Sequence, residues 1–235
     1  MSTPPKTAPS AAMPESNAPP VATADAPAGE APALGLWPGS ARPDQRAEPA
    51  RRSLFQGRII DVGLEQVRLP NGRDVELEIV RHPGGAAAVA IDDRRRVCLL
   101  RQYRHASGGW LWELPAGKLD PGEAPATTAE RELAEEAGVI ATSWDSLGRL
   151  HSSPGVLAEV IHLYLARGLR EVALGHEDEE VIEVNWLPLE QALRWCLDGT
   201  ITDAKTLVGL YRADAWLRAV TTEPAPLATA LALDA

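Results

Sequence analysis

The chain has 235 residues, with 23 Lys and Arg against 33 Asp and Glu, which gives a formal net charge of −10. This balance argues against a nucleic-acid-binding protein that relies on a broad basic surface. Because 45% of the residues are hydrophobic, the chain carries enough apolar surface for a core, which excludes disorder throughout. Cys98 and Cys196 stand among apolar neighbours, so we expect small buried side chains rather than a disulfide framework or a zinc cluster.

Both ends of the chain have the composition of tails. Residues 1–50 contain 11 Pro and 13 Ala without helical or strand periodicity, which predicts a disordered Pro/Ala-rich tail. Residues 221–235 predict a second, loose tail. Neither end carries an apolar run typical of an export signal or a membrane span, so we expect a cytoplasmic protein without a membrane partner.

Between the tails, residues 51–82 predict a small β subdomain. Residues 54–67 favour one or two strands, and Asn71-Gly72 is a strong signal for a hairpin turn. After that turn, apolar residues alternate with acidic ones over residues 74–79, which predicts a strand with one face in water.

Residues 83–220 predict one larger domain with strands on both sides of a central helix. Strands are expected at 86–91, 97–101, 110–114, 147–151, 160–166 and 181–186. Helices are expected at 125–137, 189–197 and 204–217, the last with Asp203 as its N-cap. This order of elements predicts an α/β fold built in layers.

The helix at 125–137 carries two distinct faces. Pro125 and Gly138 suit its first position and its C-terminal cap, and small apolar residues form one stripe along it. Glu132, Glu135 and Glu136 lie on another face, where like charges destabilise a helix unless they are neutralised. A solvated acidic surface is the simplest reading of such a cluster. However, a Pro- and Gly-rich loop at 114–123 leads directly into this helix, and carboxylates beside loop carbonyls favour Mg²⁺ or Mn²⁺.

The spacing of Gly117, Glu123 and the run Arg131-Glu132-Leu133-Ala134-Glu135-Glu136-Ala137-Gly138-Val139 resembles the Nudix box at every defined position. The resemblance implies a Nudix-type α/β/α sandwich of mixed sheet and helices, with a small N-terminal β-sheet subdomain. It also implies Mg²⁺- or Mn²⁺-dependent hydrolysis of a nucleoside diphosphate linked to another moiety. By the same resemblance Glu132 and Glu136 are the principal metal ligands, with Glu135 and the carbonyl of Ala116 as further ligands, and Arg131 orients the carboxylates.

Flanking residues resemble the ADP-ribose and ADP-sugar pyrophosphatase branch of that family. They are Gln102-Tyr103-Arg104, the run into the box at 112–117, and Ser153-Pro154-Gly155. The branch implies hydrolysis of ADP-ribose to AMP and ribose 5-phosphate by a homodimer. The substrate contacts that it implies are Arg104, Arg81, Glu113 and Pro154, although Arg104 also suits an exposed salt bridge. The alternatives are a pyrophosphatase for GDP-mannose, NADH or a dinucleoside polyphosphate, and a non-catalytic Nudix module that senses a ligand.

The attacking water needs a base, because a bound cation lowers the proton affinity of the helix carboxylates. In this branch the base is a glutamate on a loop before a late strand, which matches Glu180. Glu177 and Glu179 lie close enough in the sequence to serve instead, and the acidic run at 176–180 also suits a solvated turn.

Overall fold

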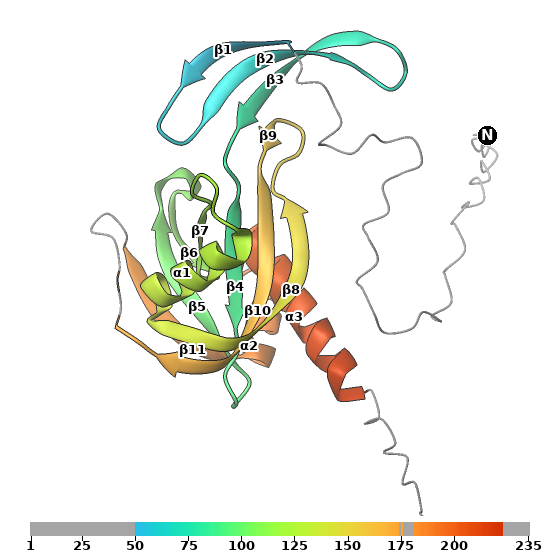
Figure 1. Ribbon diagram of the computed structural model, residues 1–235. Coiled ribbons are helices and arrows are strands. Elements are labelled where there is room, and N and C mark those ends of the chain that lie inside the picture. Colours follow the sequence, from blue (N-terminus) through green and yellow to red (C-terminus); the bar gives the residue numbers. More distant parts are fainter. Residues whose placement is uncertain (1–49, 174, 176–180, 223–235) are drawn as a thin grey trace, which may run out of the picture. The chain divides into compact units, whose positions relative to one another are not determined.

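The computed structural model describes residues 50–173, 175 and 181–222 (Figure 1). The described residues all belong to one compact unit. The predicted tails at 1–50 and 221–235 lie almost wholly outside the described residues. Three residues assigned to them belong to regular elements instead, since Ala50 begins the first strand and the last helix includes Thr221 and Thr222. No helix in the described residues is long and apolar enough to cross a bilayer.

The N-terminal part of the unit is a four-stranded sheet in the order β1-β2-β3-β9 (Figure 1). β1 (Ala50–Gln56), β2 (Asp61–Arg68) and β3 (Asp74–Arg81) pair antiparallel. The predicted turn at Asn71-Gly72 joins β2 to β3, and Gly72 has a φ of +81°, which glycine adopts without strain. The short strand β9 (Leu157–Ala158) then adds to β3 in parallel.

Two further sheets form the body of the domain. One has the order β7-β4-β10-β8, with β7 at Ala116–Lys118, β4 at Gly85–Ala90, β10 at Val160–Glu171 and β8 at Val139–His151. The other has the order β11-β5-β6, with β11 at Ile182–Pro188, β5 at Arg96–Arg104 and β6 at Gly109–Glu113. The parallel pair of β4 and β10 makes the fold a mixed α/β structure.

Three helices pack on these sheets: α1 (Pro125–Ala137), α2 (Leu189–Asp198) and α3 (Ala204–Thr222). β4 is buried along its whole length, so alternate residues serve different layers. Ala88 packs in a cluster with Leu133 of α1, whereas Val89 packs in a second cluster with Leu210 of α3. This arrangement confirms the predicted α/β/α sandwich. The short alanine side chains of β4 also let α1 lie close to the sheet.

The sequence pattern places some strand ends wrongly. β8 begins at Val139, directly after α1, and not at residue 147. Polar residues over 142–146 hide this part of the strand, yet it pairs with β10 along its length. The strands β7 and β9 are too short to produce a pattern at all. Pairing with distant strands decides these boundaries, and that pairing has no local signal.

Candidate active site

The turn before α1 brings the backbone against the helix carboxylates. The amide of Ala116 donates a hydrogen bond to Oε2 of Glu136, at 2.7 Å. A Cβ at position 117 would lie 1.7 Å from Oε1 of Glu132, so only glycine permits the approach of that carboxylate. Glu136 is 2% exposed and Glu132 is 9% exposed. The Gly117 of the motif is therefore required by packing against a carboxylate.

Arg131 lies among the other acids of the motif. Its Nη1 donates to Oε1 of Glu132 at 2.8 Å and to Oε2 of Glu135 at 3.0 Å, and its Nε donates to Oε1 of Glu123 at 3.2 Å. Hydrogen bonds from Arg131 and Thr128 lower the pKa of Glu123 to about 2. The same bond to Glu123 raises the pKa of Arg131 above its usual value. Arg131 thus contacts three of the motif carboxylates directly.

The three helix carboxylates do not meet at one point as the helix spacing suggested. Glu136 turns to the Ala116 amide, Glu132 covers Gly117, and Glu135 remains 43% exposed at the side of Arg131. Within residues 50–173, 175 and 181–222, no three His, Cys, Asp or Glu side chains are arranged to hold a metal ion. The Arg131 guanidinium lies between Glu132 and Glu135 and contacts both carboxylates.

The donor set still fits a hard divalent cation. Glu123, Glu132 and Glu135 all contact Arg131, and Glu136 lies on the same helix with its Oε2 on the Ala116 amide. All the donors are oxygens, which Mg²⁺ and Mn²⁺ prefer. Carboxylates held close together in excess of their counter-charges favour the binding of a further cation. The chemistry of the site, rather than a preformed cage, therefore points to such a metal.

Arg104, at the end of β5, is anchored by Glu113 of β6. Its Nε donates to Oε1 of Glu113 at 2.8 Å and its Nη2 donates to Oε2 at 3.0 Å, which is a bidentate pair. Glu113 is 2% exposed, whereas the Arg104 side chain is 42% exposed. The hydrogen bond to Glu113 raises the pKa of Arg104, and the charge of Glu136 contributes as well. Arg104 therefore lies within electrostatic range of the catalytic helix.

The other predicted substrate residues lie in different places. Arg81 donates from Nε to Oε1 of Glu65 at 2.9 Å in the N-terminal sheet, beside a hollow of about 240 Å³. Pro154 is exposed, in the turn that Ser153 closes by accepting from the Val156 amide at 3.2 Å. Glu177, Glu179 and Glu180 lie outside the described residues.

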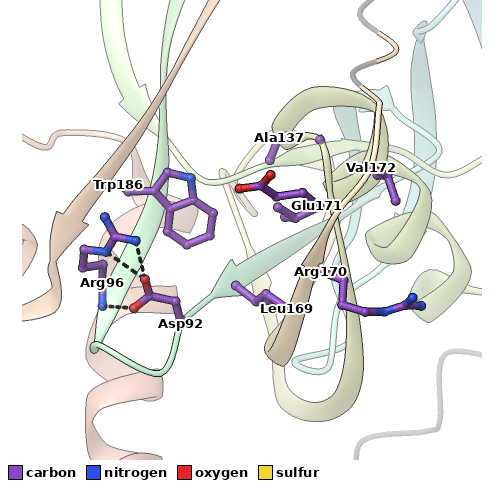
Figure 2. A pocket seen from close by; sticks show the side chains of 10 residues that line it. Asp92, Arg96, Ala137, Leu169, Arg170, Glu171, Val172 and Trp186 are labelled. Atoms are coloured by element: carbon purple, nitrogen blue, oxygen red, sulfur yellow. Dashed lines mark hydrogen bonds and ion pairs between the residues drawn. The ribbon is translucent and has the colours of Figure 1, made fainter.

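A larger cavity of about 540 Å³ opens where α1 ends (Figure 2). Its walls include Ala137, Leu169 and Trp186, and Figure 2 shows the Glu171 carboxylate turned toward the Trp186 ring. Arg96 lines it as well and is held by Asp92 at 2.7 Å. Of the predicted site residues that the structure describes, none lines this cavity, although Ala137 beside Glu136 does.

The sequence analysis misses one charged residue that lies beside Glu113. Lys205, in the first turn of α3, is 12% exposed and contacts the carboxylates of Glu113 and Asp203. Its signal in the sequence is weak but physical: a lysine at a helix N-terminus opposes the helix dipole, so it needs acidic partners. The sequence analysis names Asp203 only as the N-cap of this helix, and the fold supplies the contacts of Lys205 with both Asp203 and Glu113.

Comparisons with known proteins identify the family of this chain. The model of the NUDIX domain family matches residues 81–207. An ADP-ribose pyrophosphatase of Mycobacterium tuberculosis is 42% identical over 183 residues, covering 75% of this chain and 86% of that protein. A methanol dehydrogenase activator of Bacillus methanolicus is 39% identical over 159 residues, covering 67% of this chain and 86% of that protein.

A solved structure supports the fold as well. The crystal structure of an ADP compounds hydrolase superposes with a TM-score of 0.63 at 21% identity, covering 74% of this chain and 96% of that one. The family match and the identity to these relatives confirm the predicted family. The chain belongs to the NUDIX family, as a hydrolase that acts on a nucleoside diphosphate linked to a second moiety.

Proposed function

We propose that the protein hydrolyses the diphosphate bond of ADP-ribose, or of a related ADP-sugar, to AMP and the sugar phosphate, with Mg²⁺ or Mn²⁺. The observation that carries this proposal is the excess of carboxylates on α1 beside a half-exposed arginine that is held by Glu113. A diphosphate is an anion, and an acidic site repels it unless a bound cation reverses the local charge. The 42% identity to an ADP-ribose pyrophosphatase supports the choice of ADP-ribose as the substrate.

In this proposal Glu132, Glu135 and Glu136 hold the cation together with the carbonyl of Ala116. The cation supplies charge stabilisation at the phosphate oxygens and a lowered pKa of bound water. Arg131 keeps the carboxylates oriented through the contacts described above. The Ala116 amide holds Glu136 in place by its hydrogen bond, so the turn and the helix form one rigid unit.

Arg104 binds an anionic group of the substrate, and Glu113 keeps its guanidinium in place. Arg81 and Pro154 contribute further contacts, as they do in the family branch that the sequence resembles. The hollow beside Arg81 in the N-terminal sheet offers room for such a contact. The general base is Glu180, with Glu177 or Glu179 as the alternative.

We also propose that the protein is a homodimer that pairs through its N-terminal sheet. Large apolar side chains of this part are exposed, among them Leu54 at 54%, Phe55 at 57% and Val156 at 51%. Exposed apolar groups gathered on one small sheet are typical of an interface. Light scattering on residues 50–235 should give the mass of a dimer with full activity. A fully active monomer would contradict this assembly.

The substrate is tested by a panel of nucleoside diphosphate derivatives with Mg²⁺ and identification of the products. ADP-ribose should give AMP and ribose 5-phosphate with the highest kcat/KM of the panel. GDP-mannose, NADH and a dinucleoside polyphosphate are the competing substrates. Preference for one of these would overturn the choice of ADP-ribose and leave the family unaffected. Binding without hydrolysis of any compound would instead indicate a ligand-sensing module.

A further inference from the structure

The first turn of α3 holds two consecutive residues that precede the Nudix box. Thr206 accepts a hydrogen bond on its Oγ1 from the amide of Leu114, at 2.9 Å. Lys205, the residue before it, contacts the carboxylate of Glu113. Asp203, which precedes the helix, contacts the side chains of both Lys205 and Thr206. Its Oδ2 lies 3.1 Å from Nζ of Lys205 and accepts a hydrogen bond from Oγ1 of Thr206 at 2.6 Å. The first turn of α3 therefore packs directly against the residues that lead into the Nudix box.

Glu113 depends on the two cations that flank it. Burial by itself would raise the pKa of this carboxyl group, but the hydrogen bond from Arg104 and the charges of Lys205 and Arg104 outweigh burial and lower it. Each oxygen of the carboxylate accepts from Arg104, and Oε2 is shared with Lys205. An ionised carboxylate that is 2% exposed costs much free energy unless it is paired on all sides. Lys205 therefore helps to decide both the charge and the position of Glu113.

Arg104 has one edge left for a ligand. Its Nε and Nη2 are taken by Glu113, whereas Nη1 makes no hydrogen bond within the part of the chain that the structure describes. A guanidinium fixed along one edge presents the other in a defined direction, which suits a phosphate group. The charge of Glu136 contributes to the raised pKa of Arg104, so the Arg104 side chain lies within range of the carboxylates on α1.

We propose that Lys205 is a positioning residue, which fixes Glu113 and thereby aims the free edge of Arg104 at the diphosphate of the nucleotide substrate. The proposal rests on the proposed function in one respect, since it takes the ligand of Arg104 to be a nucleoside diphosphate. Lys205 itself makes no contact with the substrate. Its effect reaches the substrate only through Glu113 and Arg104, and this indirect route separates it from a phosphate-binding lysine.

A double-mutant cycle tests this route. Lys205→Met should raise the KM for ADP-ribose about 10-fold at saturating Mg²⁺, and Arg104→Met about 10- to 100-fold, with smaller changes in kcat. The double variant should match Arg104→Met within about twofold, because Lys205 has nothing left to position. Lys205→Arg should recover most of the wild-type KM. Effects that multiply in the double variant would overturn the proposal, as would a Lys205→Met variant with unchanged KM.

A matched control separates positioning from stability. Arg167 is also a partly buried cation that contacts α3, since it lies 4.4 Å from the Trp216 ring and pairs with Asp145 at 2.7 Å. Arg167→Met should lower the Tm without changing the KM. If it raises the KM as much as Lys205→Met does, loss of stability explains both and the proposal is wrong.

Calorimetric measurement of ADP binding to the same four proteins separates a failure of this proposal from a failure of the proposed ADP-ribose activity. If the wild-type protein hydrolyses no ADP-ribose, the proposed function fails, and the Kd of ADP across the four proteins still decides the role of Lys205. Non-additive losses of ADP affinity would support it. Independent losses, or no binding of ADP to the wild-type protein, would overturn it.

Discussion

Two networks of arginine and acidic side chains, one in the N-terminal sheet and one at α1, differ in their balance of charge. In the N-terminal sheet, Arg51 donates to Glu65 at 2.5 Å and to Asp61 at 2.8 Å, and Arg81 donates to Glu65 at 2.9 Å. Two arginines thus face two acids. In the α1 network Arg131 pairs with three glutamates, Glu123, Glu132 and Glu135. The first network is balanced by the chain itself, whereas the second leaves negative charge for a ligand to neutralise.

This difference teaches where to expect structure and where to expect chemistry. Arg51 is 11% exposed, and a Cβ at position 63 would lie 2.7 Å from its Cζ, so the guanidinium is packed beneath the sheet. A packed network whose positive and negative charges are equal in number stabilises the local fold and does not attract a further ion. An unbalanced network destabilises the free protein by repulsion, and that repulsion is relieved when a cation binds. Removal of one acid should therefore have opposite consequences in the two networks.

The largest effect should follow from the loss of an acid in the unbalanced network. Glu136→Gln removes one ligand charge but keeps an oxygen that accepts the Ala116 amide. We expect kcat to fall about 100-fold or more, since a metal contributes several kcal/mol to the stabilisation of the transition state. The Tm should stay the same or rise, because repulsion decreases. Steady-state kinetics and calorimetry measure the two quantities; full turnover in excess chelator would contradict the metal requirement.

The loop glutamates sharpen the comparison, because a base acts on water without holding the metal. Glu180→Gln should lower kcat by about 10²- to 10⁴-fold, the usual contribution of a general base, with little change in the Mg²⁺ concentration needed for half-maximal activity. If Glu180→Gln leaves kcat unchanged, the same fall in kcat in Glu177→Gln or in Glu179→Gln would identify the base.

Glu171 supplies the control for these loop variants. It lies at the end of β10 and lines the larger cavity, and Glu171→Gln should leave kcat within about twofold of the wild type. Near-normal kcat in all three loop variants would show that activated water needs no carboxylate from this segment.

In the balanced network the loss of an acid should cost stability. Glu65 is 8% exposed and pairs with both arginines, so Glu65→Gln leaves two guanidinium groups short of one counter-charge. We expect the free energy of unfolding to fall by about 1–3 kcal/mol in urea titrations. Glu76→Gln is the matched control, because Glu76 bonds Gln66 on the exposed face of the same sheet and should change stability little. Equal losses in the two variants would refute the distinction.

The smallest effect concerns Glu123, the one acid of the α1 network that Arg131 and Thr128 hold most firmly. Its pKa in the folded protein is about 2, against an ordinary value of 4.5. The lowered pKa means that the carboxylate contributes stability above pH 4.5, and that this contribution is lost as the pH falls from 4.5 toward 2. The Tm difference between wild type and Glu123→Gln should therefore narrow over this range. A difference that stays constant with pH would contradict the assignment.

Much of the fold and of the site can be predicted because the signals are local. Pro125 and Gly138 mark the ends of α1 as observed, and Gly138 caps the helix with a φ of +65°. Asp203 caps α3 by accepting from the Thr206 amide at 3.0 Å, as its position before the helix predicts. Such signals act over a few residues, so the order of the residues is enough to read them. The same holds for the spacing of the Nudix box, which identifies the family.

Contacts between distant residues have no such signal, and these decide the working arrangement of the site. Lys205 and Glu113 are 92 residues apart, and they meet only because α3 packs against the end of β6. The early start of β8 likewise depends on its pairing with β10. The sequence by itself therefore determined most of the elements, the family and the acidic helix. The tertiary structure alone decided which cation faces which carboxylate, because that choice depends on distances in space and not on spacing along the chain.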